Sequence, residues 1–116
     1  MVLKFMDNKK TPGYYLNKII DDIVFVIENT KKVSLEEFSH NDVLNCAVSF
    51  KFIQISENAK QLPETLMSVY PMIPWREING LRNRIVHDYG NVQLDIIYNT
   101  IVNDLPILLE QLRELI

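Results

Sequence analysis

Apolar residues recur every three to four positions through the last part of the chain, from Leu94 to Leu115. This spacing places one continuous apolar stripe along an α-helix, and such a stripe must be buried against other elements. Pro106 interrupts it; because proline lacks an N–H and clashes with the preceding turn, we expect a kink or break between Asn103 and Leu105. Asp104 is then expected to cap the second piece.

The remaining segments are also patterned as helices, and none shows the alternation of a strand. Ser34 and Glu37 have capping-box spacing and predict a short helical turn around Phe38. Further helices are expected over about 14–28, 41–61 and 74–87, with a short one inside 62–70. The predicted fold is therefore all-α, an up-and-down bundle of four to five helices. Residues 1–116 are expected to form one domain, with 1–12 as a flexible arm.

The helix expected over 41–61 carries apolar residues on more than one face. Its core stripe is predicted to be Val43, Leu44, Ala47, Phe50 and Ile53, and other apolar residues lie outside that stripe: Cys46, Val48, Phe52 and Ile55. Such a helix must bury one apolar face in its own bundle and the other against another subunit, so we expect a two-fold homodimer. The alternative is a monomer with a wide core face and scattered exposed apolar residues.

Composition and net charge restrict the classes of function that the chain can have. The net charge of −3 argues against broad electrostatic attraction to nucleic acid, so an RNA substrate would need local contacts from Arg76, Arg82 and Arg84 or a surface shared by two subunits. The single Cys46 fits a reducing, cytoplasmic setting and is expected as a packed core thiol. Two distant histidines without clustered ligands predict neither a metal site nor a cofactor. No apolar run approaches the ~20 residues of a membrane span.

Residues 74–91 concentrate the reactive side chains. Pro74 suits the first position of a helix, and Gly90 suits its C-cap. Trp75 is expected as a packing anchor, and apolar positions at helical spacing should face the core: Ile78, Leu81 and Ile85. The polar set at the end of this helix comprises Arg82, Asn83, Arg84, His87, Asp88 and Tyr89.

An arginine and a histidine suit metal-free cleavage of an RNA phosphodiester. Histidine can take the proton of a ribose 2′-OH near neutral pH, and arginine can grip the phosphate and stabilise its developing charge. Arg82 and His87 lie about 140° apart around an ideal helix, so they do not share one narrow stripe. The alternative is structural: Arg84 pairs with Asp88, Arg82 is solvated, and His87 is a helix end favoured by the dipole.

The segment YPMIPWREINGLRNRIVHDYGN resembles the signature of the HepT-like toxins, a branch of the HEPN superfamily of all-helical ribonucleases. The family pattern is an arginine, four residues, a histidine, one residue and a tyrosine, which Arg82, His87 and Tyr89 match. Weaker similarity extends over about 14–115. The chain departs from the family in SENAK, where Glu57 is kept but a glycine before it and an alanine after it are replaced.

The resemblance implies a dimer whose motif helices meet near the two-fold axis, with Gly80 permitting close approach. Arg82 and His87 would be catalytic, and Asn83, Arg84 and Glu57 would support them. A companion nucleotidyltransferase antitoxin would attach AMP to Tyr89, placing charge and bulk where the RNA phosphate must sit. The alternative function is a non-catalytic helical module that docks a nucleotidyltransferase or a nucleotide, in which case Arg82 and His87 are structural.

Overall fold

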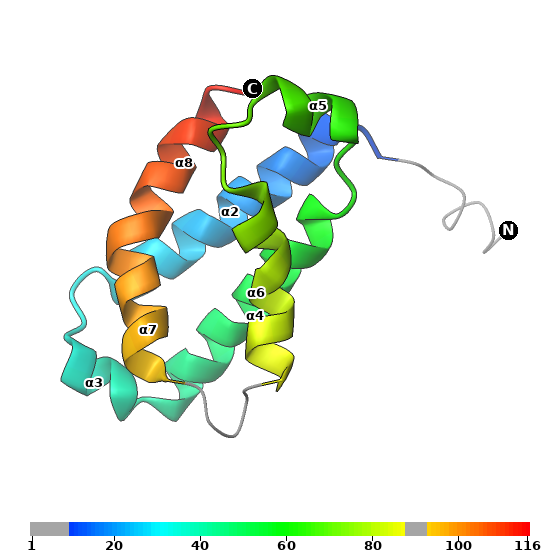
Figure 1. The fold of residues 1–116 in the computed structure, drawn as a ribbon. Helices are drawn as coiled ribbons and strands as arrows, with labels where there is room; N and C mark the ends of the chain where they lie inside the picture. The colour runs from blue at the N-terminus through cyan, green and yellow to red at the C-terminus, as the bar shows by residue number, and fades with distance from the viewer. Residues whose placement is uncertain (1–9, 88–92) are drawn as a thin grey trace, which may run out of the picture.

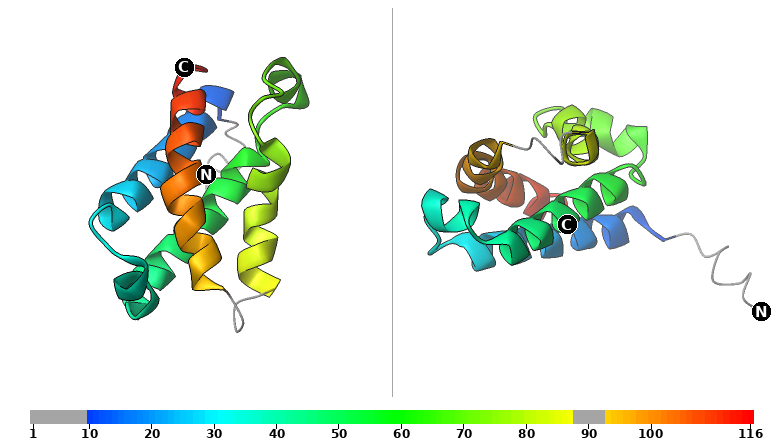
Figure 2. Two further views of the ribbon diagram at one scale, coloured as in Figure 1. Left: turned by 60° about the vertical axis from the view of Figure 1, so that its left-hand side comes forward. Right: turned by 90° about the horizontal axis from the view of Figure 1, so that it is seen from below.

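The computed structural model of the chain describes residues 10–87 and 93–116, apart from the side chains of Val86 and His87. These residues form helices and no strand, which confirms the all-α prediction. The long helices lie in two layers (Figures 1 and 2): α2 and α4 form one, and α6 and the C-terminal helix form the other. α4 packs against both α2 and α6, which makes it the centre of the bundle.

Helix α2 spans Pro12–Thr30 and begins two residues earlier than predicted. The Thr11 hydroxyl accepts a hydrogen bond from the Tyr14 N–H at 3.2 Å, and Pro12 needs no partner in the first turn. The predicted arm, 1–12, is therefore too long at its end, and residues 1–9 lie outside the described residues. The buried face of α2 includes Leu16, Ile19, Ile20, Ile23 and Val26.

The short helix α3, Leu35–Ser39, has the predicted capping box. The Ser34 hydroxyl accepts from the Glu37 N–H at 3.1 Å, and the Glu37 carboxylate accepts from the Ser34 N–H at 3.2 Å. Two N–H groups at the start of the helix are thereby satisfied. Phe38 is fully buried beneath this turn.

Helix α4, Asp42–Ala59, is rotated relative to the prediction: of the predicted core stripe, Leu44 and Ile53 pack against the core but are only partly buried. Its buried apolar residues are Val48, Phe52, Ile55 and Ala59. Two residues of the predicted stripe are largely exposed, Val43 at 81% and Phe50 at 57%. The correction has a physical reason, because the tertiary contacts orient the helix. Lys51 Nζ lies 2.9 Å from Oδ1 of Asp22, a buried carboxylate on α2.

Helix α5 spans Glu64–Val69 and is followed by α6, Trp75–His87. Pro74 precedes α6 by one position: its carbonyl accepts the first helical hydrogen bond, from the Ile78 N–H at 3.0 Å. The prediction of Pro74 as the first helical residue is therefore wrong by one. Trp75 is a packing anchor as predicted, half-buried against the core with its indole N–H donating to the Tyr70 carbonyl at 3.0 Å.

The C-terminal segment stays helical throughout, but its α-helical pattern is interrupted just before Pro106, close to the predicted position. α7, Leu94–Asn99, passes into a π-helical turn, η2, Thr100–Asp104, and then into α8, Leu105–Arg113. The Leu105 N–H donates to the Thr100 carbonyl, five residues back, just before Pro106. Asp104 makes no side-chain capping bond, so that prediction is wrong.

One hydrophobic cluster joins all the long helices and includes Phe38, Phe52, Ile78 and Leu112. α6 is fixed in this cluster by Ile78 and Ile85, with Leu81 partly buried, as predicted from their spacing. Within the described ranges, no helix combines the length and apolar character needed to cross a membrane.

Candidate active site

The site forms where α6 lies against α4. Ile78 and Ile85, both almost completely buried, hold one side of α6 in the core. Ser56 of α4 is also fully buried, and its hydroxyl donates to the Asn79 carbonyl of α6 at 2.9 Å. This hydrogen bond ties the two helices together one turn before Arg82, so the backbone carrying that arginine is held in place.

Arg82 and Glu57 form an ion pair across the two helices. Nε of Arg82 lies 2.8 Å from Oε1 of Glu57, and the two side chains are 41% and 48% exposed. Arg82 is therefore partly solvated, as the structural alternative has it, but it also has an ion-pair partner that this alternative did not include. An ion pair this exposed contributes roughly 0.2–1 kcal/mol, so it orients the guanidinium without locking it away from a stronger anion.

A second cation approaches the same carboxylate. Lys60 Nζ lies 3.7 Å from the same Oε1 of Glu57 that contacts Arg82. The sequence analysis did not single out Lys60, although its spacing of three residues from Glu57 is a usual signal for a helical ion pair. The site thus combines two cations and one carboxylate at the solvent-accessible side of α4 and α6.

The other predicted residues follow along α6. Asn83 and Arg84 are exposed. His87 is the last residue of the helix, but the structure does not describe its side chain. Asp88, Tyr89 and Gly90 lie outside the described residues, so the Arg84–Asp88 pair, the C-cap and the tyrosine remain predictions. The structure thus brings Arg82 to Glu57.

Gly80 lies at the exposed side of α6. A Cβ atom built on Gly80 would meet no heavy atom within 4 Å, so nothing in this chain requires a glycine there. Glycine costs roughly 1 kcal/mol relative to alanine in a helix interior. Position 87 follows Gly80 by about two helical turns, which places its backbone on the same face of α6.

An apolar stripe runs along α4 toward Glu57; its first three members are exposed, and the last, Ile53, is partly buried against the core. Its members are spaced alternately by three and four residues: Val43, Cys46, Phe50 and Ile53. Cys46 is exposed, so its prediction as a packed core thiol is wrong. Glu57 continues the same spacing, and the stripe therefore ends at the ion pair.

The arrangement can bind an anion. Arg82 contacts the carboxylate of Glu57 through Nε, and its guanidinium also carries two terminal nitrogens. These two nitrogens present the paired donors that suit a phosphate. Across the described part of the chain, no three histidine, cysteine or acidic side chains gather as a possible metal site.

The described residues form an all-helical bundle in which Arg82 is held at the surface and a histidine follows five residues later at the end of the same helix, as the resemblance to the HEPN ribonucleases predicted. Residues 19–115 match the family model described as "Ribonuclease HepT-like". The chain therefore belongs to the HepT-like ribonuclease family.

Two relatives show how far the similarity extends. A protein of Caldanaerobacter subterraneus named "Putative RNase TTE0752" is 36% identical over 107 residues, covering 92% of this chain and 96% of the relative. A "Probable ribonuclease HepT" of Thermococcus cleftensis is 29% identical over 109 residues, covering 91% and 99%. No solved structure matches the chain significantly.

Proposed function

We propose that this HepT-like ribonuclease is the toxin of a toxin–antitoxin pair and cleaves RNA without a metal ion, through Arg82 and His87. The observation that carries the proposal is the Arg82–Glu57 ion pair, which holds an accessible guanidinium on the helix that ends at His87. Glu57 acts as a positioning residue: by engaging Nε it directs the terminal nitrogens of Arg82 toward a phosphate.

The proposed chemistry needs only these side chains and the RNA. His87 takes the proton from a 2′-OH, and the 2′ oxygen attacks the adjacent phosphorus. Arg82 stabilises the negative charge that builds on the phosphate oxygens. The bond to the 5′ oxygen breaks, that oxygen receives the proton that His87 removed from the 2′-OH, and the products are a 2′,3′-cyclic phosphate and a 5′-OH. Asn83 and Arg84, exposed on the same helix, support phosphate binding.

A homodimer completes the site in this proposal. The α4 stripe, Val43, Cys46, Phe50 and Ile53, supplies an apolar face that ends at Glu57. Gly80, with open space at its Cβ position, allows a second motif helix to come close. Two copies meeting here would gather both arginines in one cleft, which compensates for the acidic net charge of the chain.

The proposed antitoxin is a separate nucleotidyltransferase that attaches AMP to Tyr89. The added phosphate and nucleoside would repel and occlude an RNA phosphate near His87. Incubation with the partner and ATP should raise the intact mass by whole AMP units, and Tyr89→Phe should abolish the increase. An unchanged mass, or an increase that persists in Tyr89→Phe, would remove this part of the proposal.

The nature of the nucleophile gives a direct test of the reaction. An RNA oligonucleotide should be cut with a cyclic phosphate at the new end, and the same oligonucleotide carrying 2′-O-methyl groups should resist. Cleavage should persist in EDTA. Cleavage of the 2′-O-methyl substrate, or dependence on a divalent ion, would contradict the mechanism.

The second candidate is a non-catalytic module that docks a nucleotidyltransferase or a nucleotide. The same ion pair favours it in one respect, because Arg82 already has a partner within its own chain. Expression in a sensitive host separates the two functions: His87→Ala should relieve growth arrest while the protein stays folded. Undiminished toxicity of the His87→Ala protein would exclude catalysis by this histidine.

A further inference from the structure

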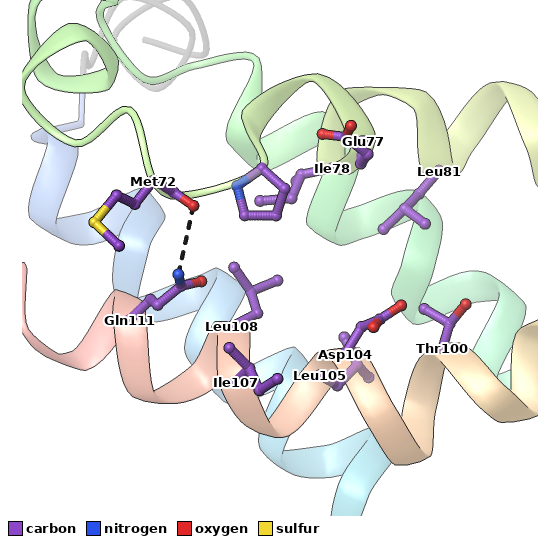
Figure 3. Close-up of a pocket in the computed structure, with 11 residues that line it drawn as sticks. Met72, Glu77, Ile78, Leu81, Thr100, Asp104, Leu105, Ile107, Leu108 and Gln111 are labelled. Carbon is purple, nitrogen blue, oxygen red and sulfur yellow. Dashed lines mark hydrogen bonds between the residues drawn. The ribbon is translucent and has the colours of Figure 1, made fainter.

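A groove of about 430 Å³ opens on the flank of α6 away from α4. It lies between α6 and the C-terminal helix, and Figure 3 shows side chains from both helices directed into it. Its volume is within the range of ligand-binding clefts. Arg82, Glu57 and Lys60 do not line it, so the groove is separate from the candidate active site.

Both walls of the groove are faces of helices. On the α6 side the lining residues are Glu77, Ile78 and Leu81. On the opposite side they recur at helical spacing: Thr100, Asp104, Leu105, Ile107, Leu108 and Gln111. At ~1.5 Å per residue, this second wall extends about 16 Å, or about three helical turns. An open groove of this length between two helices has the shape that receives the side-chain ridge of a third helix.

The floor of the groove is apolar and partly uncovered. Ile78 and Leu105 are buried, whereas Met72 is 86% exposed and Ile107 is 59% exposed. Met72 stands at one end of the groove (Figure 3), where its carbonyl accepts a hydrogen bond from Gln111 Nε2 at 3.5 Å. Removal of these exposed apolar side chains from water favours an occupant with an apolar stripe of its own.

The two charged residues that line the groove are both acidic. Glu77 lies on the α6 side and Asp104 on the opposite side, beside Thr100 (Figure 3). Among the described residues neither carboxylate takes part in an ion pair. An occupant whose apolar stripe has lysine or arginine on both sides would therefore meet one carboxylate at each rim of the groove.

We propose that this groove is the docking site for a cationic amphipathic helix of another protein. The apolar stripe of that helix lies on the floor, and its basic residues pair with Glu77 and Asp104. A second copy of this chain fits less well, because its net charge of −3 disfavours its approach to an acidic groove. The proposal is independent of the catalytic one, because it uses neither Arg82 nor Glu57.

Binding of two designed peptides to the full-length protein tests the proposal. Both are amphipathic helices of about 14 residues, or about four turns, with the same stripe of leucines and a fluorescein label. One carries lysines beside the stripe and the other carries glutamates. Fluorescence anisotropy should show saturable binding of the lysine peptide. The glutamate peptide should bind at least about tenfold more weakly, because each rim carboxylate then faces a like charge.

Two substitutions of exposed residues separate docking in the groove from attraction by net charge. Ile107→Asp should weaken binding of the lysine peptide by at least about tenfold, although it adds a negative charge, because it places a carboxylate on the apolar floor. Val102→Asp adds the same charge at a residue 51% exposed and outside the groove, and should leave binding unchanged. Circular dichroism verifies that both variants are folded. Undiminished binding to Ile107→Asp would overturn the proposal.

Reversal of the two rim charges tests the electrostatic part. The double variant Glu77→Lys, Asp104→Lys should exchange the preference and bind the glutamate peptide more tightly than the lysine peptide. Absence of binding by the lysine peptide, equal affinity for the two peptides, or an unchanged preference in the double variant would contradict the proposal. Self-association of the wild-type chain that is lost in Ile107→Asp would also refute it, and would assign the groove to a second copy.

Discussion

The contact between Arg82 and Glu57 is the residue-scale feature on which the site depends. The resemblance of residues 74–91 to a family signature identified the arginine, but Glu57 lies 25 positions earlier and only the packing of α4 against α6 brings the two together. The buried Ser56, at the position where the family resemblance implies a glycine, adds a hydrogen bond to α6 at this point. The departure from the family pattern is thus accommodated within the helix pair.

Glu57→Gln tests the positioning role. The amide keeps the shape of the side chain but not its charge, so the guanidinium should be less well oriented. We expect RNA cleavage to fall by about tenfold, mainly in kcat, while the free energy of unfolding changes by less than about 1 kcal/mol because the pair is exposed. Glu57→Asp should recover part of the rate. Equal activity of Glu57→Gln and wild type would refute the role.

At the scale of elements, helix positions were predictable and helix orientation was not. Capping by Ser34 follows from local chemistry and is confirmed, and the disturbance expected from Pro106 takes the form of a π-helical turn rather than a split. α4 has apolar residues on two faces, so its periodicity alone could not decide which face enters the core. Contacts distant in sequence decide it, among them Lys51 with Asp22 of α2.

Two phenylalanines of α4 test the corrected orientation. Phe52 is 2% exposed, so Phe52→Ala should lower the free energy of unfolding by about 3–5 kcal/mol. Phe50 is 57% exposed, so Phe50→Ala should lower the free energy of unfolding by less than about 1 kcal/mol when the chain is dilute enough to be monomeric. Urea unfolding gives both values. A larger loss for Phe50→Ala would restore the original prediction for this helix.

For the whole molecule, the two flanks of α6 have different roles. One flank of α6 packs against α4, next to the candidate active site. The other flank borders a groove between α6 and the C-terminal helix. The sequence could not reveal this division, because the groove is built from residues distant in the chain. The bounds of α6 were predicted almost correctly, because its buried positions and the proline before it are local features of the sequence.

Phe50→Asp tests the proposed dimer. A carboxylate in the middle of the α4 stripe would be buried without a partner in a dimer, so the variant should sediment as a monomer where wild type is dimeric. Val102→Asp, on another exposed surface, should leave the dimer intact. If Phe50→Asp stays dimeric, the second copy does not cover this stripe.

The most direct measurement is the rate of RNA cleavage by purified wild-type protein beside Arg82→Ala. Loss of one positioned donor to the phosphate should lower kcat by about 10²-fold or more, with unchanged helical content. Lys32→Ala, which removes the same charge from an exposed loop residue after α2, should cleave at the wild-type rate. Equal rates for Arg82→Ala and wild type would contradict the assignment of this arginine to the reaction.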